Sequence, residues 1–327
     1  MRVMVTGAAG FLGTALTRRL LSSGAVESGA GGLQPISELL LVDRQPVATP
    51  PHWGVPVRVL TGDLGKPGFA GELAKCRCDS IFHLAATLTL QAEQDPVQAY
   101  ATNVAPVRHL IEGAARPPRF VFASSIAVFG GALPEAVDDR VRAEPDTTYG
   151  THKAIVELLL ANYSRLGLAD GRALRLPIVL IRPGAASPAV SDRVAAIVRE
   201  PLAGRDVTCG LAPETRIPVA SAGAVAEALV RLHDICADRL PHGRAMNLPA
   251  LTVSVADMAA CVRRHGGPRV GAIRYEADAA LQRIVDGWPT AFVSDHASSL
   301  GLRADADFDA IVGQYLANAT PSADPIF

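Results

Sequence analysis

A tyrosine and a lysine four residues apart open a segment with helical periodicity. Tyr149 and Lys153 precede an apolar run that extends to Leu160, so both side chains lie on one face of the expected helix. A cation within about 4 to 6 Å of a phenol favours the phenolate and lowers its pKa from about 10 toward the range of a general base. Lys153 is one of three lysines in a chain with 28 arginines, and an ammonium is more easily tuned than a guanidinium. The pair predicts acid–base catalysis at Tyr149, tuned by Lys153.

A serine pair ends one of the apolar runs of the chain. Ser125 closes the segment that begins at Phe120, which reads as a buried strand. A hydroxyl at this strand end can hold the reacting oxygen of a substrate beside Tyr149, and a strand-end serine can equally cap the next turn. Both interpretations fit the sequence.

Three glycines follow the first apolar run, Arg2–Thr6, and precede a helical stretch. In such a turn the first glycine permits the tight bend, the second lets the backbone approach a pyrophosphate, and the third lets the helix pack on the strand. Free N–H groups at the helix N-terminus then bind the anion. A purely structural turn has the same spacing, so the interpretation depends on further residues. The residues expected at the dinucleotide are Gly7, Gly10, Phe11, Leu12 and Gly13.

Two aspartates follow later strands of the same region. Asp43 closes the second strand, where a carboxylate accepts bonds from both hydroxyls of the adenosine ribose and repels a 2′-phosphate. This favours NAD over NADP, although the adjacent Arg44 softens the preference. Asp63 follows the third strand and is expected either at the adenine amino group or as a turn-forming residue.

The elements that must position these residues alternate between short apolar runs and helical patterns. The runs show little polar alternation, which is typical of strands covered by helices on both faces, so we expect a doubly wound parallel α/β sheet of Rossmann type. Residues 1–185 are predicted to form this NAD-binding domain with the catalytic pair, and 186–327 mainly a smaller substrate-binding lobe, with some segments returning to the main sheet. The segment 24–32 is expected to be a surface insertion. The expected strands are Arg2–Thr6, Leu39–Val42, Val55–Leu60, Ser80–Leu84, Phe120–Ser124 and Leu174–Ile181, with short ones near Ile217 and Tyr275; expected late helices are 191–200, 222–234, 255–265 and 308–316.

Composition excludes several classes of partner. The 327 residues carry 31 basic and 32 acidic side chains, so there is no basic excess for a nucleic acid. The longest apolar runs are strand-sized, which predicts no membrane span. Five scattered cysteines lack the spacing of a common zinc site, so we expect reduced thiols, no metal and a cytoplasmic location.

The motifs occur together in the order and spacing of extended short-chain dehydrogenase/reductases, also called the NAD-dependent epimerase/dehydratase family. Besides the glycine turn and Tyr149-x-x-x-Lys153, the chain has His83-Leu-Ala-Ala86 and a serine motif beginning at Ser124. The resemblance implies that Tyr149 is the acid/base, that Lys153 tunes it and holds the nicotinamide ribose, and that Ser125 orients the substrate. It also implies a homodimer through helices near 97–115 and 149–164, and a structural role for Asn103. Further cofactor contacts implied by it are Leu64, Leu84, Ala85, Ala86, Asn103 and Pro177.

Nearly the whole chain resembles the D-erythronate dehydrogenase branch of that family. The segment Leu174–Ile178 lacks the asparagine that nucleotide-sugar enzymes carry here, and apolar residues follow Arg216. The resemblance implies oxidation of the C2 hydroxyl of a short sugar acid by NAD. Arg216 then fits as a bidentate anchor for the carboxylate or as a surface salt bridge, and Thr87 and Thr89 fit as hydroxyl contacts or as capped turns. The alternatives are a nucleotide-sugar epimerase or dehydratase that retains its NAD, and a non-enzymatic dinucleotide sensor.

Overall fold

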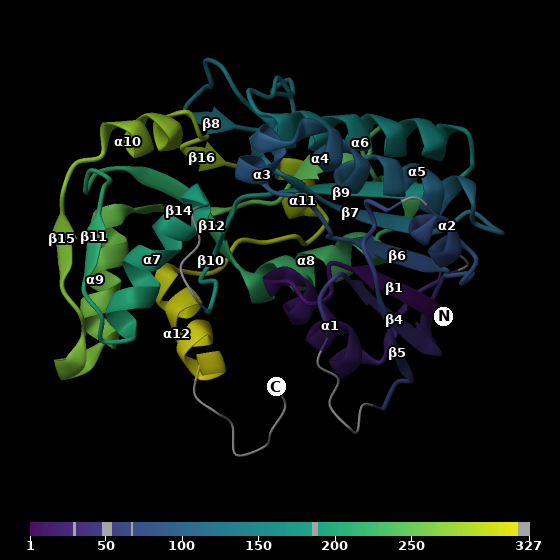
Figure 1. Ribbon diagram of the computed structural model, residues 1–327, viewed down its shortest axis with the longest axis horizontal. Coiled ribbons are helices and arrows are strands. Elements are labelled where there is room, and N and C mark those ends of the chain that lie inside the picture. The colour runs from purple at the N-terminus through teal and green to yellow at the C-terminus, as the bar shows by residue number, and fades with distance from the viewer. Residues whose placement is uncertain (29–30, 48–53, 67, 185–188, 320–327) are drawn as a thin grey trace.

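A seven-stranded parallel sheet forms the centre of the protein (Figure 1). The computed structural model describes residues 1–28, 31–47, 54–66, 68–184 and 189–319. Every neighbouring pair of strands in the sheet is parallel. The strand order reverses at the first strand of the chain: the next two strands of the sheet lie on one side of it and the remaining four on the other. The order is β13 (Ala245–Asn247), β9 (Asp170–Leu176), β7 (Arg119–Ser125), β6 (Ser80–His83), β1 (Arg2–Thr6), β4 (Glu38–Asp43) and β5 (Val57–Thr61). The predicted doubly wound α/β fold is confirmed.

Helices cover both faces of this sheet, which explains why its strands are apolar throughout. Along β1, Val3 and Val5 pack in one core and Met4 in the other, as the alternation of side chains along a strand requires. The first core lies under α1 (Phe11–Ser23) and α8 (Ala222–Asp234), which pack against each other. The second lies under α2 (Phe69–Ala74), α5 (Ala105–Glu112) and α6 (Thr148–Arg165), with α3 (Thr89–Gln94) and α4 (Pro96–Asn103) beside α6.

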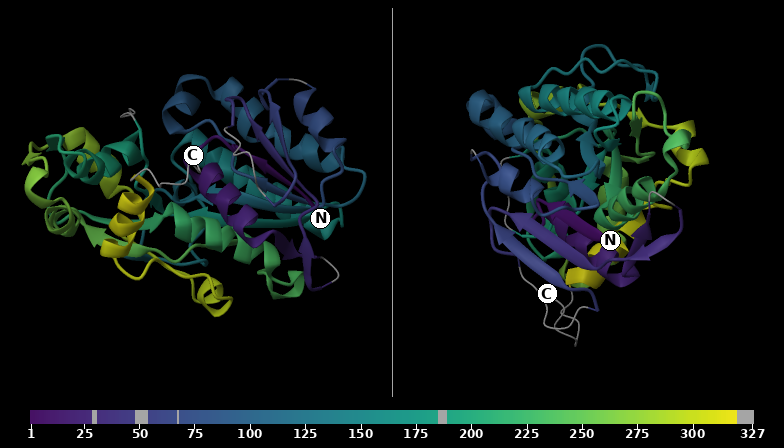
Figure 2. Two further views of the ribbon diagram at one scale, coloured as in Figure 1. Left: turned by 90° about the horizontal axis from the view of Figure 1, so that it is seen from below. Right: turned by 90° about the vertical axis from the view of Figure 1, so that its right-hand side faces the viewer.

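A smaller lobe with its own core lies beside the carboxyl edge of the main sheet (Figure 2). Its centre is a three-stranded sheet, β10 (Ile178–Leu180), β12 (Arg216–Ser221) and β14 (Leu251–Ser254), in which β10 and β12 are parallel and β14 is antiparallel. The helices of this lobe are α7 (Val190–Leu202), α9 (Val255–His265), α10 (Ala279–Asp286) and α12 (Phe308–Ala319); the paired short strands are β11 (Val207–Cys209) with β15 (Ile273–Tyr275), and β8 (Ala136–Val137) with β16 (Ala291–Phe292).

Strand β13 and helices α8 and α11 (Asp295–Ser299) follow residue 185 in sequence but pack with the main sheet. Arg172 on β9 reinforces this packing. Its guanidinium, fully buried, donates to the carbonyls of Leu232 and His233 at 2.7 and 2.6 Å, and to that of Ile235. The end of α8 is thereby fastened to the sheet.

The predicted strand Leu174–Ile181 is wrong as a single element. The structure divides it into β9, which ends at Leu176 in the main sheet, and β10, which begins at Ile178 in the sheet of the smaller lobe. Pro177 separates them, because a proline has no N–H to donate to a strand ladder. The sequence analysis also missed a short antiparallel strand pair, β2 (Ala25–Glu27), which lies in the predicted insertion, with β3 (Leu33–Pro35), which directly follows it.

Among the helices that the structure describes, none combines the length and apolar character that crossing a bilayer requires.

Candidate active site

The predicted site residues other than Arg216 lie at or near the carboxyl edge of the main sheet, because all its strands run in the same direction. This is the edge where ligands bind in open α/β sheets, at the point where the strand order reverses. Two loops meet there closely. A Cβ added to Gly7, after β1, would lie 2.8 Å from the backbone nitrogen of Ala85, after β6. The backbones of the loops that follow β1 and β6 therefore approach each other too closely for a side chain on Gly7.

The glycine turn between β1 and α1 leaves the start of the helix open. Gly7 has a φ of 73°, a conformation that favours glycine, and a Cβ on Gly13 would overlap the carbonyl oxygen of Gly7. Gly10 is the N-cap of α1 and provides no side-chain cap, so the first N–H groups of the helix, at Phe11 and Leu12, face no capping side chain. Such a terminus is suited to an anion. The geometry fits the pyrophosphate of a dinucleotide.

Asp43 lies at the end of β4, beside this turn. Its carboxylate accepts from the backbone nitrogen of Ala9 at 3.0 Å and from that of Gln45 at 2.9 Å. These bonds hold the carboxylate next to the glycine turn, where it was expected to meet a ribose. Asp63, after β5, accepts instead from the backbone nitrogen of Gly65 at 2.9 Å, which is the turn-forming geometry. The neighbouring Leu64 is buried.

The loop after β6 carries Leu84, Ala85 and Ala86, and Asn103 braces it. The buried Asn103 amide accepts from the backbone nitrogen of Thr87 at 2.7 Å and donates to the Thr87 carbonyl at 3.0 Å. Asn103 thus anchors the loop backbone, in agreement with the structural role that the resemblance implies. Thr87 is half-buried, and Thr89 is the exposed first residue of α3.

Ser125 and Tyr149 meet because α6 approaches the strand end closely. Ser125 ends β7, and its hydroxyl accepts from the backbone nitrogen of Ala127 at 3.1 Å, within a single 3₁₀ turn. A Cβ on Gly150, the residue after the tyrosine, would overlap the carbonyl oxygen of Ala127. The glycine therefore lets the first turn of α6 rest on the segment that follows β7, which brings the Tyr149 phenol within hydrogen-bonding reach of Ser125. Ser125 caps the turn and faces Tyr149 at once.

Lys153 is buried one helical turn after Tyr149. Its ammonium donates to the carbonyl of Ala123 at 2.7 Å and lies 4.5 Å from the centre of the Phe122 ring and 5.4 Å from that of Tyr149. Burial lowers the pKa of Lys153 to about 7, against the opposing field of the Glu157 carboxylate. The lysine is thus easily deprotonated for its type, and only 3% exposed.

The pKa of Tyr149 differs from the sequence prediction. Burial raises it to about 12, and the hydrogen bond with Ser125 acts in the opposite direction without balancing it. The prediction that Lys153 lowers this pKa is therefore wrong for the structure described here. The reason is physical. Burial disfavours the charged phenolate, and the same burial lowers the pKa of Lys153, so that less of the lysine carries the positive charge that would stabilise a phenolate. At neutral pH the phenol carries its proton.

His83, at the end of β6, is a packing residue. It is fully buried, its ring is stacked on that of Phe122 with centroids 6.1 Å apart, and its Nδ1 lies 2.8 Å from the Thr6 hydroxyl. Burial, with a smaller contribution from Lys153, lowers the pKa of His83 to about 3.

The sequence analysis missed a buried ion pair beneath the catalytic helix face. Glu157 on α6 binds Arg175 on β9, with Oε2 and Nη2 2.8 Å apart, and accepts from the Ser124 hydroxyl at 2.5 Å. The sequence did indicate that Glu157 lies beside the catalytic pair, since Tyr149, Lys153 and Glu157 are spaced four residues apart and share one helix face.

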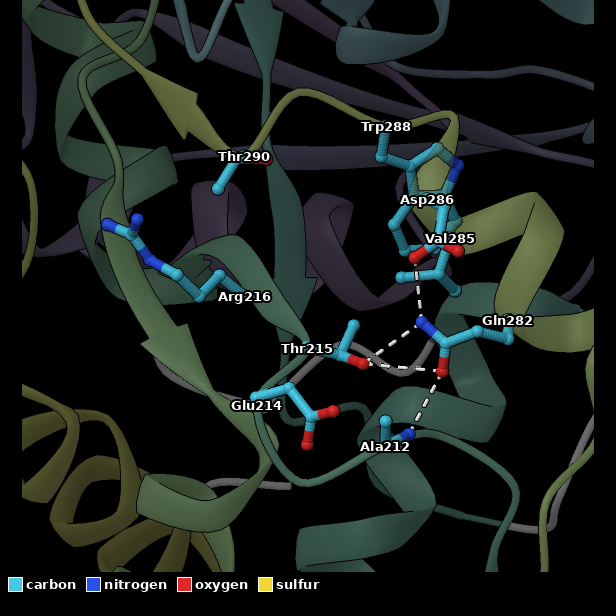
Figure 3. A pocket seen from close by; sticks show the side chains of 9 residues that line it. All are labelled: Ala212, Glu214, Thr215, Arg216, Gln282, Val285, Asp286, Trp288 and Thr290. Carbon is cyan, nitrogen blue, oxygen red and sulfur yellow. Dashed lines mark hydrogen bonds between the residues drawn. The ribbon is translucent and has the colours of Figure 1, made fainter.

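Arg216 lies at the start of β12 and lines a cavity of about 370 Å³ in the smaller lobe (Figure 3). Its side chain is 51% exposed, and Nη1 lies 3.6 Å from Glu135. Across the cavity, Gln282 bonds Thr215 and Asp286, with Trp288 above them. The sequence reasoning did not identify this opposite wall.

Pro177 directly follows β9 and precedes β10, the first strand of the smaller lobe's sheet.

Comparisons with known proteins identify the family. Residues 3–248 match the NAD dependent epimerase/dehydratase family. The chain is 39% identical to a D-erythronate dehydrogenase from Cupriavidus necator over 98% of this chain and 99% of the relative, and 36% identical to one from Haemophilus influenzae over 97% and 99%. A solved structure described as the nucleoside-diphosphate-sugar epimerase from Agrobacterium tumefaciens is 33% identical, covers 98% of this chain and 94% of its own, and superposes with a TM-score of 0.89. The chain belongs to the NAD dependent epimerase/dehydratase family.

Proposed function

We propose that this protein is an NAD-dependent dehydrogenase that oxidises the C2 hydroxyl of D-erythronate to 2-dehydro-D-erythronate. One observation carries the proposal: Ser125, Tyr149 and Lys153 lie together at the sheet edge that holds the glycine turn. The two D-erythronate dehydrogenases, each similar over nearly the whole chain, support the sugar-acid substrate. A dinucleotide sensor would need the glycine turn but not this group of three residues.

In the proposed mechanism Tyr149 takes the proton of the C2 hydroxyl. NAD, when bound, supplies the acceptor for the hydride that leaves C2. Ser125 donates to the oxygen that becomes the carbonyl, and Lys153 would hold the nicotinamide ribose. One proton and one hydride leave the substrate, which becomes a 2-keto acid. Gly7, Gly10, Gly13 and Asp43 are assigned to the cofactor.

The pKa of Tyr149 gives this mechanism a direction of pH dependence. Because burial raises that pKa to about 12, the phenolate required for oxidation becomes more abundant as the pH rises, whereas the phenol required for the reverse reduction is present at neutral pH. Oxidation should therefore accelerate toward alkaline pH.

The substrate carboxylate is assigned to Arg216, whose guanidinium is half-exposed at the cavity wall and weakly paired. A planar guanidinium binds a carboxylate through two parallel hydrogen bonds. Thr87 and Thr89 are assigned to the remaining hydroxyls.

Steady-state assays of NAD reduction with C4 to C6 aldonic acids test the proposal. Tyr149→Phe should reduce kcat by orders of magnitude without unfolding the protein, and near-normal turnover would remove Tyr149 from the mechanism. Arg216→Met should mainly raise KM for the acid, whereas Arg140→Met, at an exposed arginine paired with Asp138, should leave KM unchanged. An unaltered KM in the Arg216 variant would refute carboxylate anchoring.

A second candidate function is nucleotide-sugar epimerisation, which the 33% identity to the Agrobacterium tumefaciens structure favours. Such an enzyme keeps its NAD bound through the cycle. Stoichiometric release of NADH during turnover supports the dehydrogenase, and retained cofactor with no net reduction supports the epimerase.

We further propose a homodimer in the cytoplasm. Apolar side chains are exposed on the adjacent helices α4 and α6, with Val97 83% and Leu158 73% exposed. All five cysteines are free thiols, which is usual in a reducing compartment. Light scattering after gel filtration tests the assembly, and Leu158→Glu should yield the monomer.

A further inference from the structure

The carboxylate of Glu157 lies in the interior, where it makes four short polar contacts. It accepts from the Ser124 hydroxyl at 2.5 Å, from Arg175 Nε at 3.0 and 3.2 Å, and from Arg175 Nη2 at 2.8 Å. The residue is 6% exposed. A buried carboxylate is costly unless it is fully bonded, and here the bonds come from two different strands.

The sheet register explains how these partners meet. Ser124 on β7 and Arg175 on β9 are paired neighbours, so their side chains lie on the same face of the sheet, under α6. The residue before Ser124 is Ala123, whose carbonyl accepts from the Lys153 ammonium at 2.7 Å. Two consecutive residues of β7 therefore bind α6: Ala123 binds the Lys153 ammonium, and Ser124 binds the Glu157 carboxylate.

The surroundings of Lys153 contain few charges. From its own helix, Tyr149 and Glu157 face it; from β6, His83 does. His83 is neutral at working pH because burial lowers its pKa to about 3, and Tyr149 holds its proton. Of these three groups, only Glu157 forms an ion pair with a cation, Arg175.

We propose that Glu157 is a positioning residue that keeps the buried ammonium of Lys153 protonated, its carboxylate being fixed for this purpose by Ser124 and Arg175. The carboxylate touches neither the proposed substrate site nor the glycine turn, and acts through Lys153. This inference rests on the proposed function only in giving Lys153 a catalytic role. A simpler alternative is that Glu157 merely neutralises Arg175.

NMR titration of the lysine side chains tests the proposal directly, because the chain has only three lysines, Lys66, Lys75 and Lys153. With ¹³C-labelled lysine the Cε shift of each residue reports its protonation, and loss of one signal in Lys153→Arg assigns the buried one. Lys66 and Lys75 are exposed and serve as internal references. The titration needs neither substrate nor turnover, so its result is independent of the activity assays above.

The decisive comparison is Glu157→Gln against Arg175→Met. Both variants break the same ion pair, but only the first removes the negative charge. We expect the Lys153 midpoint to fall by about one pH unit or more in Glu157→Gln and to stay or rise in Arg175→Met. Equal falls in both variants, or no fall in the first, would overturn the proposal.

Glu157→Gln leaves the Arg175 guanidinium buried without its partner, which endangers folding. The double variant Glu157→Gln with Arg175→Met removes both charges and avoids this problem. Its Lys153 midpoint should lie below that of the unmodified protein and at or above that of the single Glu157 variant, because the Arg175 cation is also gone. A midpoint equal to that of the unmodified protein would refute the assignment.

Discussion

Replacing Lys153 by methionine should abolish catalysis. It should also remove a pH-dependent decrease in the free energy of unfolding that the buried lysine causes. The wild-type lysine has a pKa of about 7 in the folded protein, against an ordinary value of 10.5. Between these values the unfolded chain binds more protons than the folded one, so the free energy of unfolding rises with pH. The cost is fully present below pH 7 and is relieved as the pH approaches 10.5.

The size of the effect follows from the two pKa values. For a group with these values, the free energy of unfolding should increase by about 2 kcal/mol between pH 7 and pH 9. Lys153 is 3% exposed, so solvent screening does not reduce this figure much. The Lys153→Met variant lacks this contribution, and its advantage over the wild type should shrink by the same amount across the interval.

Urea unfolding of both proteins at pH 7, 8 and 9 measures the difference. The change in pH dependence is the test, because loss of the bond to Ala123 shifts the variant's stability by a constant amount. Lys75→Met is the matched control, since Lys75 is 70% exposed and its removal should leave the pH dependence unchanged. Parallel curves for the wild type and Lys153→Met would refute the reasoning about burial.

Two further substitutions test the scaffold. Gly13→Ala places a Cβ 2.7 Å from the Cα of Ala8 and against the Gly7 carbonyl, so the turn must open; NAD affinity, measured by calorimetry, should fall at least tenfold, and normal affinity would contradict the assigned turn. Arg172→Met leaves three carbonyls of the α8 end without their donor, which should lower the free energy of unfolding by about 3 kcal/mol in urea; a change below about 1 kcal/mol would show that these bonds contribute little.

The sequence predicted the fold because its strands are short, apolar and separated by helical patterns, and because parallel strands bring their carboxyl ends together. Contacts made across the sheet were not predictable in the same way. The bonds of Glu157 to Ser124 and Arg175 depend on strand register, which no local pattern reveals. The pKa of Tyr149 was predicted in the wrong direction because spacing indicates a neighbour but not the depth at which both groups are buried.

The boundary at Pro177 also has a consequence for protein engineering. The chain leaves the main sheet after Leu176 and enters the second sheet at Ile178, and β13 later returns to the edge of the first. A fragment that stops near residue 185 would lack β13 and the α8 cover of one sheet face, exposing apolar residues such as Val3 and Val5. Fragments obtained by cutting the gene at the lobe boundary should therefore be insoluble. A circular permutant opened at an exposed loop tip is the better way to move the termini.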